Sequence, residues 1–546
     1  MKKTTSEGAA TTVADVLVSE LAAWGITLYF GIPGASSLPL VDAVRRNPDA
    51  RYIVVRHEQT AALAASAYNK FTGKIAVCLT IAGPGATNLA TGLYDAKEDR
   101  ASVLALSGQA KTQYAGPGGI QEIDQDAFFR PISVFNNTVA DPKTAVKLLT
   151  RAIRYAIVGR GVAQLSIPND VQREPLEPSY CERETCLPEV RVAPTDEAVR
   201  AAVEVIDAAQ RPVILAGFGS MNAAGALLDL AKTIQAPIVT TFRAKGVLPE
   251  ENEWVAGVHG PLGTPHARAF VEESDLVIAC GASFSDFTGI PWEKRVVHID
   301  IDPLQLGKHP FTAAVWGDCA VAIPRIREQV RARDDPSVRK RLAEQKQAWS
   351  EQLDREADPK AVPIRPPYIM KVLSETLPED ALISIDVGEN LWWFGRNFRM
   401  KRQRFAMSGY LGTMGFGLPG AIAAKLAYPD ATVVCITGDG GFSMVMADFV
   451  TAVKYGLPLV VVILNNHELA MIREEQREAN YPPYGTELTN PDYALYAESC
   501  GGAGIRVTRP LDLPDAVRRA LMMDKPVVID IETDRNGLSD SLVHES

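Results

Sequence analysis

Short apolar runs alternate with longer amphipathic stretches along nearly the whole chain. The apolar runs are rich in Val and Ile, and many end in Gly or Asp, as strands buried on both faces of a parallel sheet do. Alternation of such strands with helices predicts the α/β fold class, in which helices flank open, mostly parallel sheets and ligands bind at the carboxyl ends of strands. The predicted strands are LYFGI (28–32), IAVCLTIAG (75–83), VLALSG (103–108), VAQLSIP (162–168), PVILAG (212–217), PIVTT (237–241), LVIACG (276–281), VVHIDID (296–302), ALISIDVG (381–388), TVVCITGDG (432–440), LVVVILNN (459–466) and VVIDIET (527–533).

Two segments interrupt this alternation. Residues 173–194 are rich in Pro and Glu and lack periodicity, and residues 325–367 begin with a highly charged helix and close on a Pro-rich stretch. Both segments are typical of linkers. They divide the chain into three predicted α/β domains, at 1–175, 190–335 and 365–546.

Composition and charge narrow the class of protein. A chain of 546 residues is too long for one hydrophobic core, and its net charge of −10 with no basic stripe argues against a nucleic-acid partner. No apolar stretch is long enough for a membrane span, and MKKTTSEGAATT lacks the apolar run of a secretory signal. The seven cysteines are scattered, and nothing near the closest pair, Cys181 and Cys186, completes a metal site. We therefore expect a cytoplasmic protein with reduced thiols and no membrane partner.

Candidate chemistry appears at the ends of two successive predicted strands. TVVCITGDGG is a strand that enters a glycine turn, where backbone N–H groups can approach an anion, and Asp439 offers a carboxylate there. Asn466 offers an amide oxygen at the end of LVVVILNN. Strand–helix–strand returns a chain to the same edge of a parallel sheet, so the two oxygens can converge. Each feature alone is ordinary turn chemistry, but together with a backbone carbonyl and phosphate oxygens they suit Mg²⁺.

This stretch resembles the diphosphate-binding motif of thiamine diphosphate (ThDP) enzymes, which begins GDG and ends NN. By that resemblance Asp439, Asn466 and the backbone oxygen of Glu468 hold Mg²⁺, which in turn holds the diphosphate of ThDP. Further motifs that look like acetolactate synthases and pyruvate oxidases follow in the right order over nearly all of the chain: YFGIPG (29–34), RHEQTAALAA (56–65), GPGATN (83–88), QEID (121–124), HIDIDP (298–303) and GTMGFGLPGAIAA (412–424).

The resemblance implies the ThDP-enzyme fold and a role for each domain. It makes 1–175 the pyrimidine-binding domain, 190–335 an FAD-type domain and 365–546 the diphosphate-binding domain. It also implies which further residues surround the cofactor: Gly412, Thr413, Met414, Gly438, Gly440, Gly441, Leu469, Ala470 and Met471.

Three residues are predicted to be catalytic. Glu58 lies within YIVVRHEQTAALAASAY (52–68), where a predicted strand enters a helix, a place that the helix dipole alone would explain. In the resembling family the matching Glu hydrogen-bonds the aminopyrimidine ring of ThDP and promotes loss of its C2 proton, so we expect Glu58 to be buried and to hold or share a proton. Met414, otherwise ordinary core packing, would lie between the two rings of ThDP. Gln121 matches a polar residue near the substrate of acetolactate synthases.

Two departures from the biosynthetic pattern affect the reaction and the second cofactor. Acetolactate synthases of that kind have a Trp after the Asn pair, whereas this chain has Glu475, which looks closer to pyruvate oxidases and catabolic acetolactate synthases. HIDIDP resembles the FAD-binding domain, with Asp300 or Asp302 near the ribose or adenine. A GARFDDR-like segment, however, reads GASFSDF (281–287) and has lost both arginines. FAD binding is predicted. The alternatives of a vestigial, empty or ADP-binding domain are left open.

The predicted function is carboligation: two molecules of pyruvate, a small 2-oxo acid, give 2-acetolactate and CO₂, or related acyloins form. The alternative is a pyruvate oxidase-like oxidoreductase that passes electrons to FAD. A non-catalytic ThDP-fold subunit is a third possibility, which the retention of Glu58, Met414, Asp439 and Asn466 disfavours. In the resembling families the site forms between the first domain of one subunit and the third of another, which implies a homodimer or homotetramer.

Overall fold

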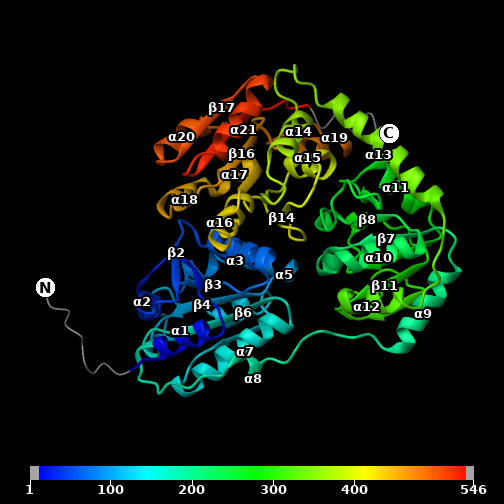
Figure 1. The fold of residues 1–546 in the computed structure, drawn as a ribbon. Helices are drawn as coiled ribbons and strands as arrows, with labels where there is room; N and C mark the ends of the chain where they lie inside the picture. The colour runs from blue at the N-terminus through cyan, green and yellow to red at the C-terminus, as the bar shows by residue number, and fades with distance from the viewer. Residues whose placement is uncertain (1–10, 537–546) are drawn as a thin grey trace.

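The computed structural model describes residues 11–536, which fold around three six-stranded sheets (Figure 1). Every strand pair in these sheets is parallel. The predicted fold class is thus confirmed: three domains, each with a parallel sheet flanked by helices. The exact domain boundaries stay a prediction.

The N-terminal domain, blue to cyan in Figure 1, has helices on both faces of its sheet. Along its first strand Tyr29 packs into one hydrophobic cluster and Phe30 into the other, as alternating side chains of a doubly covered strand must. The strand order is β2 (Arg51–Val54), β1 (Leu28–Gly31), β3 (Val77–Thr80), β4 (Val103–Gln109), β6 (Val162–Pro168), β5 (Phe135–Thr138). The helices are α1 (Val13–Ala23), α2 (Leu38–Arg46), α3 (Glu58–Thr72), α4 (Pro84–Thr87), α5 (Ala90–Glu98), α6 (Gln125–Phe129) and α7 (Ala145–Val158).

The central domain, green in Figure 1, repeats this architecture. Its strand order is β12 (Ala313–Trp316), β11 (Val296–Asp300), β10 (Leu276–Cys280), β7 (Pro212–Ala216), β8 (Ile238–Thr240), β9 (Val255–Val258). Its helices are α9 (Asp196–Ala208), α10 (Ala224–Ile234), α11 (Pro265–Glu273), α12 (Cys319–Arg327) and α13 (Pro336–Glu356). The charged helix predicted at the second linker is α13, and it is anchored to the protein because its Leu342 is completely buried.

The C-terminal domain, yellow to red in Figure 1, carries the third sheet. Its strand order is β14 (Arg404–Ala406), β13 (Leu382–Ile385), β15 (Val433–Gly438), β16 (Val460–Asn465), β18 (Val527–Glu532), β17 (Ala503–Val507). Its helices are α14 (Pro366–Thr376), α15 (Glu389–Asn397), α16 (Gly417–Ala427), α17 (Asp439–Val445), α18 (Phe449–Lys454), α19 (Ala470–Glu478), α20 (Tyr493–Ser499) and α21 (Leu513–Leu521).

The first and third domains share one hydrophobic core. Helix α3 lies against α16 across the domain boundary (Figure 1), and both helices belong to a single buried cluster. Both helices contribute several buried Ala side chains to this cluster, and small side chains let helix backbones approach closely. This packing holds the N-terminal end of α3, where Glu58 lies, in a fixed relation to the C-terminal domain.

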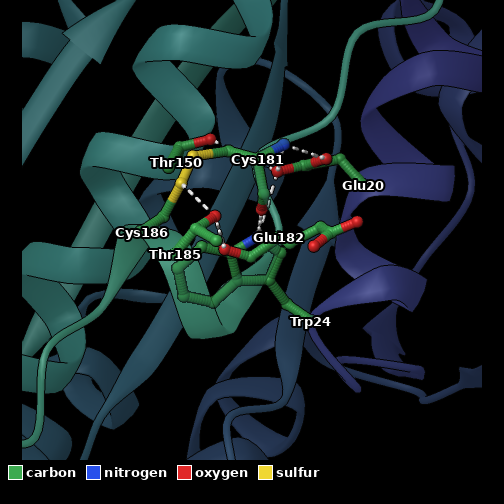
Figure 2. The surroundings of a disulfide bond; sticks show 7 residues. All are labelled: Glu20, Trp24, Thr150, Cys181, Glu182, Thr185 and Cys186. Atoms are coloured by element: carbon green, nitrogen blue, oxygen red, sulfur yellow. Dashed lines mark hydrogen bonds between the residues drawn. A yellow bond between two sulfur atoms is a disulfide. The ribbon is translucent and has the colours of Figure 1, made fainter.

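A disulfide between Cys181 and Cys186 corrects the prediction that all thiols are reduced (Figure 2). The one-turn helix α8 (Arg183–Cys186) folds this segment back on itself, which brings the two Cα atoms to 6.1 Å, a distance a disulfide can span. The segment is also tied to α1, because Trp24 donates its indole N–H to the carbonyl of Cys181 at 2.8 Å. The other five cysteines are free thiols, as predicted.

Within residues 11–536 no helix combines the length and the apolar character that a membrane crossing requires. The cytoplasmic location stays a prediction.

Candidate active site

A cavity of about 1070 Å³ lies between the central and C-terminal domains. Its walls come from the segments that follow β7, β10 and β11 in one sheet and β13, β15 and β16 in the other. These are the carboxyl ends of parallel strands, where ligands bind in open α/β sheets. Residues from the N-terminal domain, Arg100 and Arg160 among them, also line the cavity.

Asp439 and Asn466 both line this cavity, at the ends of neighbouring strands. Strands β15 and β16 pair with Gly438 opposite Leu464, so the residues that follow each strand emerge at the same edge of the sheet. Both side chains are buried, with exposed fractions of 2% for Asp439 and 5% for Asn466. The predicted convergence of one carboxylate and one amide is therefore present in the structure.

The surroundings of Asp439 fit a bound cation. Burial raises the pKa of the Asp439 carboxyl, and none of the Lys or Arg side chains in the described residues forms an ion pair with it. Its Oδ2 accepts a hydrogen bond from Asn490 Nδ2 at 2.6 Å. A desolvated carboxylate without a cationic partner is costly unless a metal ion or a proton neutralises it.

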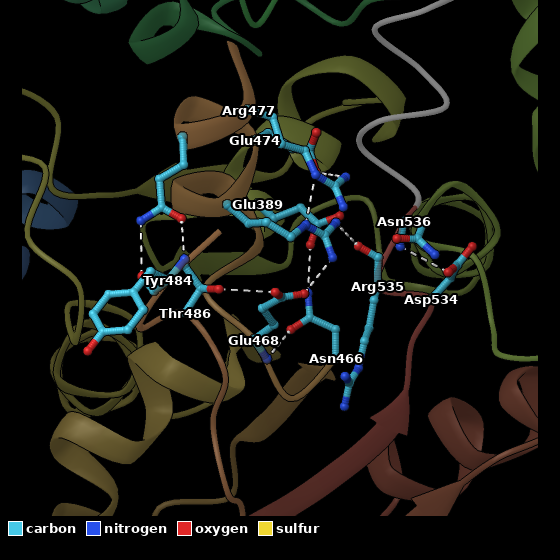
Figure 3. Close-up of polar contacts among 12 residues, drawn as sticks. Glu389, Asn466, Glu468, Glu474, Arg477, Tyr484, Thr486, Asp534, Arg535 and Asn536 are labelled. Carbon is cyan, nitrogen blue, oxygen red and sulfur yellow. Dashed lines mark hydrogen bonds and ion pairs between the residues drawn. The ribbon is translucent and has the colours of Figure 1, made fainter. Parts of the chain in front are cut away.

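The second and third proposed ligands, Asn466 and Glu468, are held by their own contacts (Figure 3). Asn466 Oδ1 accepts the backbone N–H of Glu468 at 3.0 Å. The Glu468 carboxylate accepts hydrogen bonds from Arg473 Nη1 at 2.5 Å and from the Thr486 hydroxyl at 3.1 Å. That carboxylate is therefore engaged away from a metal, which leaves the backbone oxygen as the group that Glu468 can offer.

Carboxylates and imidazoles alone make no metal site here: no group of three or more His, Cys, Asp or Glu side chains in residues 11–536 is arranged to hold an ion. A site built on one carboxylate, one amide and one carbonyl needs phosphate or water oxygens to complete an octahedron. Mg²⁺ bound together with a diphosphate has that requirement. The donor set thus fits Mg²⁺ as part of a cofactor complex and not as a free-standing ion.

Met414 and Gly412 line the cavity next to the glycine turn. A Cβ at Gly440 would lie 3.0 Å from Cε of Met414, so the Met side chain reaches over the turn that follows β15. Gly440, Gly441, Leu469, Ala470 and Met471 line the same wall. Thr413 does not line the cavity. Its hydroxyl donates to the Met414 carbonyl at 2.9 Å.

Sequence reasoning missed Asp386, which anchors the Met414 loop. Its carboxylate, completely buried behind the cavity, accepts the backbone N–H groups of Gly415 at 2.8 Å and Gly417 at 3.1 Å and the Thr437 hydroxyl at 3.1 Å. Burial raises the pKa of Asp386, and these hydrogen bonds act in the opposite direction. An acid at the end of the predicted strand ALISIDVG was the available signal.

Glu389 was missed as well. It is the first residue of α15 and lines the cavity. Its carboxylate accepts from Asn466 Nδ2 at 2.8 Å (Figure 3). It also accepts from Trp393 Nε1 at 2.9 Å. Burial raises the pKa of Glu389 to about 7. A second carboxyl group is thus in direct contact with a proposed metal ligand.

Glu58 and Gln121 lie elsewhere, in the N-terminal domain. Glu58 starts α3, is buried as expected, and accepts a hydrogen bond from Asn88 Nδ2 at 2.9 Å. A Cβ at Gly85 would lie 3.4 Å from Oε1 of Glu58, and a Cβ at Gly83 would lie 2.9 Å from the carbonyl oxygen of Gln121. The two residues therefore flank one turn, but neither lines the cavity that holds Asp439.

Of the two candidate acids in HIDIDP, only Asp300 lines the central-domain half of the cavity. Asp300 lines the cavity and is buried, and burial raises its pKa. Asp302 does not line the cavity; it accepts the backbone N–H of Leu304 at 2.9 Å and pairs with Arg100 at 3.4 Å. Arg243 and Arg268 line this half of the cavity. These two side chains come from other segments and supply positive charges that GASFSDF lacks.

This half also fits a dinucleotide. The turns after β7 and β10 meet backbone to backbone, since a Cβ at Gly281 would lie 2.5 Å from backbone atoms of Gly219. Such close glycine turns admit a phosphate group to backbone N–H groups, and buried Asp300 can accept from a hydroxyl group. The residues present are therefore compatible with FAD.

Family models match all three parts of the chain. They describe the N-terminal TPP binding domain of thiamine pyrophosphate enzymes over residues 11–128, the central domain over 199–326 and the C-terminal TPP binding domain over 386–531. Thiamine pyrophosphate is another name for ThDP.

Curated relatives match over nearly the full length. YdaP of Bacillus subtilis, whose name proposes that it contains thiamine pyrophosphate, is 40% identical over 95% of this chain and 91% of its own. A pyruvate oxidase of Lactiplantibacillus plantarum is 34% identical over 94% of this chain and 87% of its own. An acetolactate synthase large subunit of Parasynechococcus marenigrum is 34% identical over 96% of this chain and 87% of its own.

Proposed function

Since this chain belongs to the thiamine pyrophosphate enzyme family, we propose that it uses ThDP and Mg²⁺ to decarboxylate a small 2-oxo acid such as pyruvate. The two-carbon unit is then joined to a second carbonyl compound, which gives 2-acetolactate or a related acyloin. The observation that carries this proposal is that Asp439, Asn466 and Met414, from three separate segments, line one cavity.

The residues of the C-terminal domain bind and orient the cofactor in this proposal. Asp439, the Asn466 amide oxygen and the backbone oxygen of Glu468 hold Mg²⁺ and through it the diphosphate. Asp386 fixes the loop that carries Met414, and Met414 would lie against the cofactor rings. ThDP, when bound, supplies the electron sink that lets a 2-oxo acid lose CO₂.

Glu58 supplies the proton chemistry and comes from a second subunit. It does not line the cavity formed by its own chain, although its side chain is buried and oriented by Asn88. We therefore propose a homodimer, or a homotetramer built from such dimers, in which the Glu58–Gln121 region of one subunit completes the cavity of another. Glu58 then holds a proton at the aminopyrimidine ring.

A second candidate function is oxidation with FAD as electron acceptor. The observation that favours it is the single cavity, which extends from Asp439 and Met414 to Asp300 and Arg243. FAD held by Asp300, Arg243 and Arg268 would share that space with ThDP and supply a two-electron acceptor. Glu475, which also lines the cavity, is the residue by which this chain departs from biosynthetic acetolactate synthases.

One experiment tests both candidates. Pure protein is incubated with pyruvate, ThDP and Mg²⁺, with and without an artificial electron acceptor, and the products are identified. Acetolactate or its decarboxylation product acetoin, formed without the acceptor, supports carboligation. Acetate or acetyl phosphate, formed only with the acceptor and with no C–C product, supports oxidation. Absence of CO₂ release in both conditions rules out pyruvate as the substrate.

A further inference from the structure

The Glu389 carboxylate bridges two side-chain donors, Trp393 and Asn466, of which Figure 3 shows Asn466. One oxygen, Oε1, accepts from Trp393 Nε1 at 2.9 Å, and the other, Oε2, accepts from Asn466 Nδ2 at 2.8 Å. Trp393 lies one helical turn further along α15 and is completely buried, so its indole N–H holds the Glu389 carboxylate in place from the protein interior. Glu389 therefore presents one well-placed acceptor to Asn466.

That contact decides which end of the Asn466 amide faces the site. A carboxylate accepts and a backbone N–H can only donate, so Nδ2 must face Glu389 and Oδ1 must face the N–H of Glu468. A reversed amide would oppose oxygen to oxygen on one side and N–H to N–H on the other. Asn466 is 5% exposed, which leaves little water to compensate for such losses.

The amide oxygen keeps a free acceptor position in this orientation. A carbonyl oxygen has two lone pairs, and the Glu468 N–H uses one of them. A divalent cation can take the other.

We propose that Glu389 is a positioning residue that turns the amide oxygen of Asn466 toward the divalent cation. This inference rests on the proposed function, since it assigns Asn466 as a ligand of the cofactor-bound metal. Glu389 acts through Asn466 and makes no contact with the ion itself. Residues that orient metal ligands in this way are typically worth about 10–100-fold in metal affinity.

A simpler role would be electrostatic, because any carboxylate in this cavity attracts a cation. Glu475 provides the matched control: it lines the same cavity, and among the described residues Asn466 donates its side-chain N–H to Glu389 and not to Glu475. Glu389→Gln and Glu475→Gln each remove one negative charge from the cavity. Only Glu389→Gln also disturbs the bridge, since an NH₂ group replaces one of the two carboxylate oxygens and cannot accept from the donor, Asn466 or Trp393, that it then faces.

The experiment measures the Kd for Mn²⁺, used as the probe ion, by electron paramagnetic resonance of the free ion at saturating ThDP. We expect Glu389→Gln to weaken Mn²⁺ binding about 10–100-fold and Glu475→Gln to leave it within about twofold. In an Asn466→Ala background, Glu389→Gln should add no further loss, because a residue that acts through Asn466 has nothing left to orient.

Three outcomes would overturn the inference: wild-type Kd in Glu389→Gln, equal losses in both Gln variants, or full additivity with Asn466→Ala. If Glu389→Gln fails to fold, Glu389→Asp replaces it, since its shorter side chain cannot reach both donors. Wild-type affinity in Glu389→Asp then counts against the proposal, and a loss counts for it. If the wild-type protein binds neither ThDP nor Mn²⁺, the proposed function fails, which is a separate result.

Discussion

Asn490 donates a side-chain N–H to Oδ2 of Asp439 at 2.6 Å. The same amide nitrogen donates to Oδ1 of Asn465 at 2.9 Å, so one side chain links the segments at the ends of β15 and β16. Asn490 lies on neither strand; it belongs to the loop before α20. The position of the Asp439 carboxylate thus depends on a segment about fifty residues further along the chain.

Asp439→Ala is expected to weaken Mg²⁺ and ThDP binding together. It removes the only charged ligand assigned to the ion, which would then hold the diphosphate through Asn466, a backbone oxygen and water. Excess ThDP and Mg²⁺ should therefore restore part of the activity. Calorimetric titration of each variant with ThDP at fixed Mg²⁺ measures the effect.

Asn490→Ala provides the control for Asp439→Ala. It keeps the carboxylate and deletes one hydrogen bond to it, which is worth about 1.5–3 kcal/mol for a charged acceptor. A smaller loss of affinity than in Asp439→Ala is expected. If Asp439→Ala binds Mg²⁺ and ThDP as the wild type does, Asp439 is not a metal ligand.

Twelve of the predicted strands prove to be the inner strands of the three sheets. Inner strands are buried on both faces, and their continuous apolar runs are visible in the sequence. Five of the six edge strands were not predicted; only β2, within YIVVRHEQ, was recognised as a strand entering a helix. Edge strands pair on one side only and carry mixed sequences. The missed strands are β5 (FNNT), β9 (VAGV), β12 (AAVW), β14 (RFA) and β17 (AGIRV).

The candidate site, too, was predictable from the sequence only in part. The relation between Asp439 and Asn466 follows from the geometry of two successive parallel strands, so their order in the sequence was sufficient. The contact of Asn490 was not predictable, because a loop brings this side chain to the site and no local pattern determines where a loop folds. Glu389 directly follows the predicted strand ALISIDVG, but its hydrogen bond to Asn466 depends on α15 beginning at this residue. The disulfide between Cys181 and Cys186 depends in the same way on a one-turn helix.

Cross-complementation tests whether the active site is shared between subunits. Glu58→Gln and Asp439→Ala chains with different affinity tags are co-expressed, and the mixed dimer is purified through both tags. If each site takes Glu58 from one subunit and Asp439 from another, one site of the mixed dimer is intact, and about half of the wild-type activity should return. If both residues came from one chain, both sites would be defective. An inactive mixed dimer would therefore contradict the shared site.

Asp300→Ala is expected to weaken FAD binding about tenfold or more, because a buried charged acceptor in the cavity wall is lost. Asp302→Ala is the matched control, since Asp302 lies outside the cavity wall and should leave FAD affinity near the wild-type value. Flavin absorbance of the purified protein and fluorescence titration with FAD measure the effect. Equal affinities in all three proteins would mean that Asp300 does not contact the flavin nucleotide.

The disulfide predicts a definite count of reactive thiols. Alkylation of the unfolded, unreduced protein should modify five of the seven cysteines, and prior reduction should expose all seven. Closing so short a loop is worth about 2 kcal/mol of the free energy of unfolding in the chain-entropy model. Cys186→Ser should therefore lower the melting temperature and leave activity unchanged. Seven alkylated cysteines without reduction would show that the bond does not form in solution.

Glu58→Gln should bind ThDP but fail to activate it. The substitution keeps the shape of the side chain and leaves the diphosphate anchor at Asp439 intact, so the Kd for ThDP should stay near that of the wild type. An amide cannot exchange a proton with the aminopyrimidine ring, so exchange of the C2 proton of bound ThDP for deuterium should slow by orders of magnitude. Asn88→Ala, which deletes the hydrogen bond at 2.9 Å to Glu58, should slow exchange less. Exchange at the wild-type rate in Glu58→Gln would reduce Glu58 to a carboxylate that only stabilises the start of α3.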